Sequence, residues 1–158
     1  MNIYIGDGSR IMNRIKNQHC SGNVEGSSLR KHIANAMGFQ LSKTQRDNGS
    51  WRVRLNLPNP KIGESQITNY LRTGEWKFVV CPIGVEAKDF QFYAIQNISP
   101  KPILNINMGS WNQEMLNVYK DLLYKLESCP VHNYNQIASI PNEAGVYLFI
   151  HEKNTNSF

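Results

Sequence analysis

The spacing of apolar positions alternates along the chain between the period of strands and the period of helices. Short apolar or alternating stretches predict strands at 2–5, 51–57, 75–81 and 145–150. Apolar residues three and four positions apart predict helices at 10–19, 28–37, 64–72, 86–98 and 112–127. The proline-containing stretch 100–105 is expected to be extended. Together these elements predict an α+β domain with one small antiparallel sheet flanked by helices.

The segment WRVRLNL at 51–57 has a clear strand alternation. The residues expected to face the core are Trp51, Val53, Leu55 and Leu57, and those expected to face solvent are Arg52, Arg54 and Asn56. This arrangement would put two arginines and one amide side by side on an exposed surface.

The length of 158 residues predicts a single domain over 1–158. No apolar run approaches the roughly 18 residues that a membrane span needs, so no membrane partner is expected. The first ten residues, MNIYIGDGSR, lack the pattern of a secretory signal. A cytoplasmic location is therefore the default expectation, with the nucleus as the alternative. Three widely spaced cysteines match neither a disulfide framework nor a zinc site.

The net charge of +5 is compatible with binding a polyanion. The basic residues gather between positions 10 and 54, and they are Arg10, Arg14, Lys16, Arg30, Lys31, Lys43, Arg46, Arg52 and Arg54. A cluster of this size is suited to phosphate contacts. Composition alone equally allows a set of solvated helix faces, and it leaves both interpretations open.

Several stretches resemble the pattern of the GIY-YIG nucleases, with restriction-type members closest. NIYIGDGSRIMNRIKNQH contains Tyr4-Ile5-Gly6 followed by Arg14 and His19, and SPKPILN ends on Asn105. SSLRKHI and GESQITNYLRTGEWKFVV are similar to the middle of restriction-type members. The segment IPNEAGVYLFI carries Gly145-Val146-Tyr147, which is similar to the first strand of the family.

The order of these stretches is rotated relative to the family. Moving 143–158 in front of 1–106 restores the usual order and leaves 107–142 as a connecting segment with a helix. The chain ends would then lie in the loop of a β-hairpin, where circular permutation is physically tolerated. The alternative is a domain-swapped homodimer in which a second copy supplies Tyr147.

The resemblance implies a set of catalytic residues around one phosphate. Tyr4 and Tyr147 would face each other and orient or deprotonate a water, which requires a lowered tyrosine pKa. Arg14 would supply the charge that lowers this pKa and would clamp the phosphate. His19 would share the proton transfer, or else is a surface histidine at a helix end. Asn105 would hold a phosphate oxygen or the hairpin, or else caps a turn.

The resemblance also implies a divalent metal, Mg²⁺ or Mn²⁺, held by a glutamate. Gln91 occupies the corresponding position, and its neutral oxygen is a weaker ligand than a carboxylate. Three interpretations are open. A deliberate substitution replaced the glutamate, or catalysis was lost while DNA binding was kept, or the ligand is instead Glu86 or Asp89.

Contacts with double-stranded DNA are expected from two groups of residues. Arg52, Arg54 and Asn56 could read base edges. The residues expected to contact backbone phosphates are Arg30, Lys31, Lys43 and Arg46. The sequence thus predicts a metal-dependent DNA endonuclease. The alternatives are a non-catalytic DNA-binding module on the same scaffold and an unrelated α+β protein, in which the two tyrosines would lie far apart.

Overall fold

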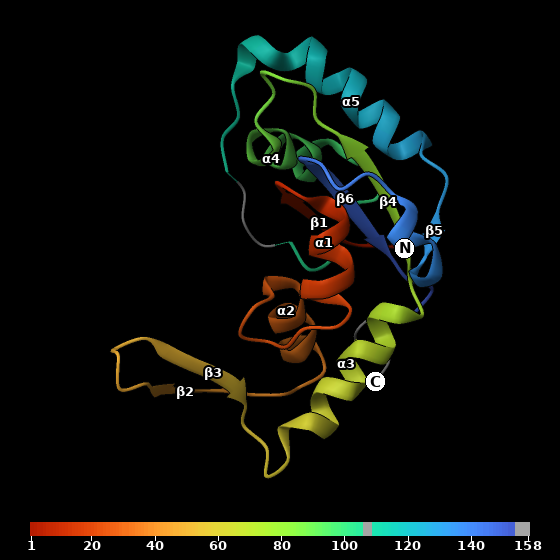
Figure 1. The fold of residues 1–158 in the computed structure, drawn as a ribbon. Coiled ribbons are helices and arrows are strands. Elements are labelled where there is room, and N and C mark those ends of the chain that lie inside the picture. Colours follow the sequence, from red (N-terminus) through yellow and green to blue (C-terminus); the bar gives the residue numbers. More distant parts are fainter. Residues whose placement is uncertain (106–108, 154–158) are drawn as a thin grey trace.

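The protein is built around a four-stranded antiparallel sheet with the strand order β1-β6-β4-β5. The structure is a computed structural model and describes residues 1–105 and 109–153. The strands are β1 (Asn2–Gly8), β6 (Gly145–Ile150), β4 (Glu75–Val80) and β5 (His132–Asn133). Figure 1 shows that β1 and β6 lie side by side although they come from opposite ends of the chain. The prediction of an α+β fold with a small antiparallel sheet is confirmed.

The two faces of the sheet are covered by separate apolar cores, because successive strand side chains face opposite sides. In β6, Val146 and Leu148 pack into one core, whereas Tyr147 and Phe149 pack into the other. Gly145 through Phe149 are all buried. The strand therefore lies inside the sheet, between β1 and β4, with an apolar core on each side.

One face is covered by helices from the first half of the chain (Figure 1). These helices are α1 (Ile11–Asn13), the π-helix η1 (Arg14–His19), α2 (Ser28–Ala36) and α3 (Pro60–Arg72). The short 3₁₀ helix η3 (Tyr134–Ser139), from later in the chain, packs into the same core through Ile137. The helix predicted at 10–19 exists, but its second half widens into a π-helix. The helix predicted at 64–72 begins earlier, at Pro60, because the Asn59 side chain caps it and proline is favoured in the first turn.

The opposite face is covered by α4 (Ala87–Asn97) and α5 (Leu116–Ser128), the latter preceded by the 3₁₀ turn η2 (Gln113–Met115). α4 agrees with the predicted range 86–98 within one residue at each end. The predicted range 112–127 corresponds to η2 followed directly by α5, which together span 113–128. The extended stretch 100–105 runs along the edge of β1, where the Leu104 N–H donates to the Ile3 carbonyl at 2.9 Å. In the residues that the structure describes, no helix is long and apolar enough to cross a membrane.

A second, two-stranded sheet is formed by β2 (Leu41–Gln45) and β3 (Trp51–Leu55). Figure 1 shows this ribbon reaching away from the rest of the domain. Leu55 is buried at its base, but Trp51 is 56% exposed. The prediction that Trp51 faces the core is therefore wrong, because none of the layers formed by the described residues reaches the end of the ribbon.

Candidate active site

The pairing of β1 with β6 brings the two predicted tyrosines onto one face of the sheet. Gly6 lies opposite Tyr147, and Tyr4 lies opposite Phe149. Tyr4 and Tyr147 both belong to the same apolar core, with Tyr147 fully buried and Tyr4 8% exposed. The alternative of an unrelated fold required these tyrosines to be far apart, and the structure contradicts it.

Gly6 is the residue that allows Tyr147 to occupy its place. A Cβ atom at position 6 would overlap the hydroxyl end of the Tyr147 side chain. Only glycine leaves room for the ring to lie across the strand at this position. The spacing from Tyr4 to Gly6 thus has a direct steric reason in the pairing of the two strands.

His19 links the tyrosine pair to the helix that follows β1. It is the last residue of η1 and is fully buried, so it is not the surface histidine of the alternative interpretation. Its Nε2 lies 2.5 Å from the Tyr147 hydroxyl, and its Nδ1 lies 2.6 Å from the Ser27 hydroxyl. Ser27 also accepts the Arg30 N–H at 3.1 Å, which caps α2. One serine therefore caps a helix and orients an imidazole.

The protonation of this group is set by burial. Burial first, and then the charges of Arg14 and Arg30, lower the pKa of His19 to about 3, so the imidazole is neutral near neutral pH. Burial also raises the pKa of Tyr147 and of Tyr4, and it outweighs the opposing effect of Arg14. The expectation that Arg14 lowers the tyrosine pKa below its usual value is therefore wrong.

Arg14 lies at the start of η1, with its guanidinium beside Tyr147. Its Nη1 donates to the Gln18 amide oxygen at 2.5 Å. Its Nε is buried and has no hydrogen-bond partner among the residues that the structure describes. A buried donor without a partner is unusual in a folded protein. This donor could pair with an acceptor oxygen of a ligand.

Asp7, which was not anticipated from the sequence, lies opposite Val146 and so on the other face of the sheet, but its charge acts on Arg14 and Tyr4. Burial raises the pKa of this carboxyl, whereas Arg14 and Lys88 act in the opposite direction and Glu86 adds to the rise. Asp7 lies beyond the strand predicted at 2–5, because β1 continues to Gly8. The alternation of β1 puts Asp7 on the same face as Ile5, so a local pattern could not link it to the tyrosines.

Asn105 and Gln91 both bind the backbone of the same β1 residue. The Asn105 amide accepts the Ile5 N–H at 2.7 Å and donates to the Ile5 carbonyl at 2.9 Å. The Gln91 amide nitrogen donates to that same carbonyl at 3.0 Å. Asn105 therefore holds the backbone of β1 beside the sheet, and it is not a simple turn cap.

The residues around Gln91 do not fit a magnesium site as they stand. Gln91 is 9% exposed and offers one neutral oxygen, because its nitrogen is bound to Ile5. The alternative ligand Asp89 is bound to the Tyr119 hydroxyl and the Asn112 N–H on the α5 side. Glu86 is exposed at the start of α4. Across 1–105 and 109–153, no three His, Cys, Asp or Glu side chains group in a way that could hold a metal.

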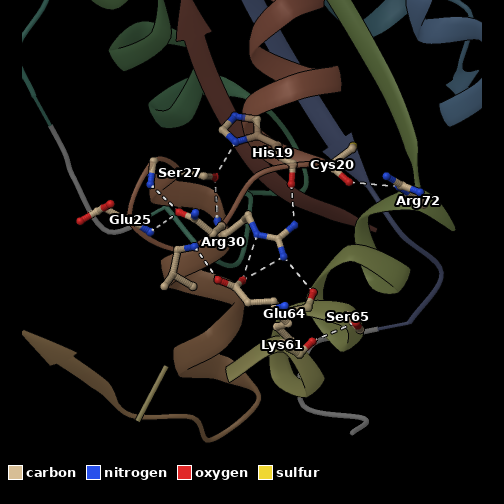
Figure 2. Close-up of polar contacts among 12 residues, drawn as sticks. His19, Cys20, Glu25, Ser27, Arg30, Lys61, Glu64, Ser65 and Arg72 are labelled. Carbon is tan, nitrogen blue, oxygen red and sulfur yellow. Dashed lines mark hydrogen bonds and ion pairs between the residues drawn. The ribbon is translucent and has the colours of Figure 1, made fainter. Parts of the chain in front are cut away.

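Arg30 is fully buried and does not lie on the predicted DNA surface. Figure 2 shows its guanidinium between His19 and Glu64. It donates to the His19 carbonyl at 2.8 Å and to the Glu64 carbonyl at 2.8 Å, and it forms an ion pair with the Glu64 carboxylate at 3.0 Å. The prediction of a phosphate contact at Arg30 is wrong. Glu64, which lies 34 positions later in the sequence, pairs with Arg30 inside the domain.

The other side chains predicted to contact DNA differ in their exposure and in whether they already form an ion pair. Arg46 forms a partly exposed ion pair with Glu25 at 2.8 Å, and Lys31 is half-buried on α2. Lys43, Arg52 and Arg54 are exposed on the ribbon of β2 and β3. The structure thus divides the basic cluster into an internal part and a projecting part.

Comparison with known protein families identifies a family for the domain that carries this site. A sequence model of the GIY-YIG catalytic domain matches residues 1–125, which include β1, η1, α4 and Asn105. No curated protein and no solved structure matches the chain. Since the match spans well over half of the 158 residues, the chain belongs to the GIY-YIG catalytic domain family.

Proposed function

We propose that this domain is a cytoplasmic, restriction-type DNA endonuclease that acts on phosphodiester bonds of duplex DNA, in a form that Gln91 leaves inactive. The observation that supports the proposal is the hydrogen bond of 2.5 Å between His19 and Tyr147 beside Arg14, all within a GIY-YIG domain. Hydrolysis of a phosphodiester needs a positioned water, a place for its proton and positive charge near the phosphate. Together with Tyr4, these residues can position the water and supply part of the positive charge.

Each residue has a distinct task in this proposal. Arg14 donates to a phosphate oxygen through the nitrogen that has no partner among the described residues. Tyr4, the less buried tyrosine, orients the attacking water. His19 is neutral, so its Nε2 accepts the hydrogen bond of the Tyr147 hydroxyl and holds that hydroxyl beside Arg14.

The metal requirement is the second part of the proposal. Members of the family generally use a divalent metal, which we take to be Mg²⁺ or Mn²⁺, and Gln91 stands at the glutamate position. In the Gln91→Glu variant, a carboxylate oxygen would replace the amide nitrogen that now lies 3.0 Å from the Ile5 carbonyl oxygen. Two oxygens at that distance repel each other unless a cation lies nearby. We therefore expect the glutamate variant to gain stability from Mg²⁺.

We further propose that the chain is a circularly permuted member of the family. The support is that β6, which carries Gly145-Val146-Tyr147 outside the matched residues 1–125, pairs with β1. In this arrangement one chain supplies both tyrosines, so the site needs no second copy. Parts of the segments concerned, 106–108 and 154–158, lie outside the described residues.

A non-catalytic DNA-binding domain is the second candidate. The observation that favours it is the hydrogen bond from the Gln91 amide nitrogen to the Ile5 carbonyl, which a glutamate could not make in its ionised form. In that case the glutamine completes the packing of α4 against β1, and the domain recognises DNA without cutting it.

The deciding experiment compares the protein with its Gln91→Glu variant on supercoiled plasmid, with and without Mg²⁺. Gln66→Glu is the matched control, since it makes the same chemical change on the exposed side of α3. We expect cleavage by Gln91→Glu alone, only with Mg²⁺, and its loss when Tyr4→Phe is added. If neither protein cuts but both bind duplex DNA, the second candidate holds. If the original protein cuts as fast as the variant, Gln91 is not at the metal position and Glu86 is tested next.

A further inference from the structure

The ribbon of β2 and β3 is a braced arm outside the body of the domain (Figure 1). Arg46, just after β2, donates to the Trp51 carbonyl at 2.6 Å and to the Glu25 carboxylate at 2.8 and 2.9 Å. Glu25 also accepts the Val53 N–H at 3.1 Å. Leu55 is buried where the ribbon joins the body. These contacts fix the direction of the arm, so its side chains are presented in a defined arrangement.

The two faces of this ribbon carry different chemistry. Residues directly opposite each other in an antiparallel pair lie on the same face. One face bears the pairs Leu41–Leu55, Lys43–Val53 and Gln45–Trp51, and the other bears Ser42–Arg54 and Thr44–Arg52. The second face, which we call the arginine face, carries two exposed arginines and two hydroxyls with no carboxylate among its four side chains.

The shape and chemistry of the arginine face fit one kind of partner. The major groove of B-form DNA admits a two-stranded β-ribbon, and arginine binds guanine there with two hydrogen bonds. Serine and threonine hydroxyls accept from or donate to either kind of base pair. The A-form duplex of RNA has a major groove too narrow and deep for side chains to read. The positive charge of the arginine face, the width of the B-form major groove and the hydrogen-bond donors of the four side chains therefore favour duplex DNA as the partner.

We propose that the arginine face, formed by Ser42, Thr44, Arg52 and Arg54, enters the major groove and determines the DNA sequence at which the domain binds. The inference rests on the proposed function for its partner, duplex DNA, but not on catalysis. Lys43, on the opposite face, would point away from the bases and reach the backbone. The two faces of one small element thus separate sequence recognition from general attraction to phosphate.

The test begins with selection of binding sites from a pool of random duplex DNA. The key variant changes Arg52 and Arg54 together to lysine, which keeps the charge but removes the paired hydrogen bonds. We expect this variant to bind the selected site about 10- to 100-fold more weakly, with unselected duplex bound as before. The matched control, Lys43→Ala, should weaken both duplexes by the same factor. Circular dichroism confirms that each variant is folded.

Four results would overturn the inference. The lysine variant could select the same sequence with the same affinity, Lys43→Ala could cause the same selective loss, or the pool could yield no preferred duplex. Preferential binding of single strands or of RNA duplex would also overturn it. If Gln91→Glu fails to cut plasmid while the arginine face still governs selection, the nuclease proposal fails and this inference stands.

Discussion

Acidification is expected to destabilise the domain through His19, which is fully buried. Its pKa in the folded protein is lowered from the ordinary value of 6.5 to about 3. The unfolded chain therefore takes up a proton over a pH range in which the folded chain does not. The contribution of His19 to stability is fully present above about pH 6.5 and is lost as the pH falls toward 3.

The size of this loss follows from proton linkage. At about pH 4.5 the unfolded histidine lies two units below its ordinary pKa, and each unit corresponds to about 1.4 kcal/mol. The folded histidine is still almost entirely neutral there, since its pKa is about 3. The expected loss is thus about 2.7 kcal/mol relative to neutral pH, a substantial part of the roughly 5–15 kcal/mol that stabilises a typical domain.

Urea unfolding at about pH 7 and pH 4.5 measures this loss, and the variant His19→Gln provides the comparison. Glutamine retains hydrogen-bonding groups but does not titrate. Burial lowers the pKa of His32 and His151 as well, and both remain in the variant. The difference in pH dependence between the two proteins therefore reports on His19. An equal loss of stability in both proteins would refute the reasoning.

Three further substitutions test the packing of the site. Ser27→Ala removes a helix cap and the partner of a buried imidazole nitrogen, so urea unfolding should show that the free energy of unfolding falls by about 2–4 kcal/mol. The control Ser28→Ala, at an exposed position, should lower it by less than about 0.5 kcal/mol. Gly6→Ala should cost about 1–3 kcal/mol by displacing the tyrosine ring beside it, whereas Gly26→Ala should have little effect because a Cβ there meets nothing within 4 Å; thermal melting of both variants decides. Arg30→Leu removes the ion-pair partner of the partly buried Glu64 carboxylate and the donors to two carbonyls, and a chemical unfolding curve should show a loss of about 2–4 kcal/mol.

The strongly patterned elements could be predicted from the sequence. The strand at 145–150 and the helices at 28–37 and 86–98 have apolar spacing that matches the faces they bury. The two tyrosines could be placed on opposing strands because the resemblance supplied a pairing that periodicity alone does not give. Local pattern and family resemblance together were enough to bring Tyr4 near Tyr147.

The partners of buried polar groups could not be predicted in the same way. The segment 41–45, LSKTQ, has little apolar alternation, so β2 was missed and the ribbon was not anticipated. Serine is a residue type favoured at helix starts, as Ser27 is for α2, but its bond to His19 depends on the segment after η1 bringing the two helices together. The burial of Arg30 depends on Glu64, which lies on a different helix. Such pairs are set by tertiary packing, which a local pattern does not contain.

The different environments of Arg30 and the ribbon arginines change how the positive charge of this chain is understood. A charge inside the domain acts on neighbouring groups, and Arg30 does so by lowering the pKa of His19 and holding its carbonyl. A charge on the projecting ribbon acts on a partner, since Arg52 and Arg54 are exposed there. Counting basic residues along the sequence adds these two effects together. Substitutions inside should therefore alter stability and chemistry, whereas substitutions on the arginine face should alter which DNA is bound.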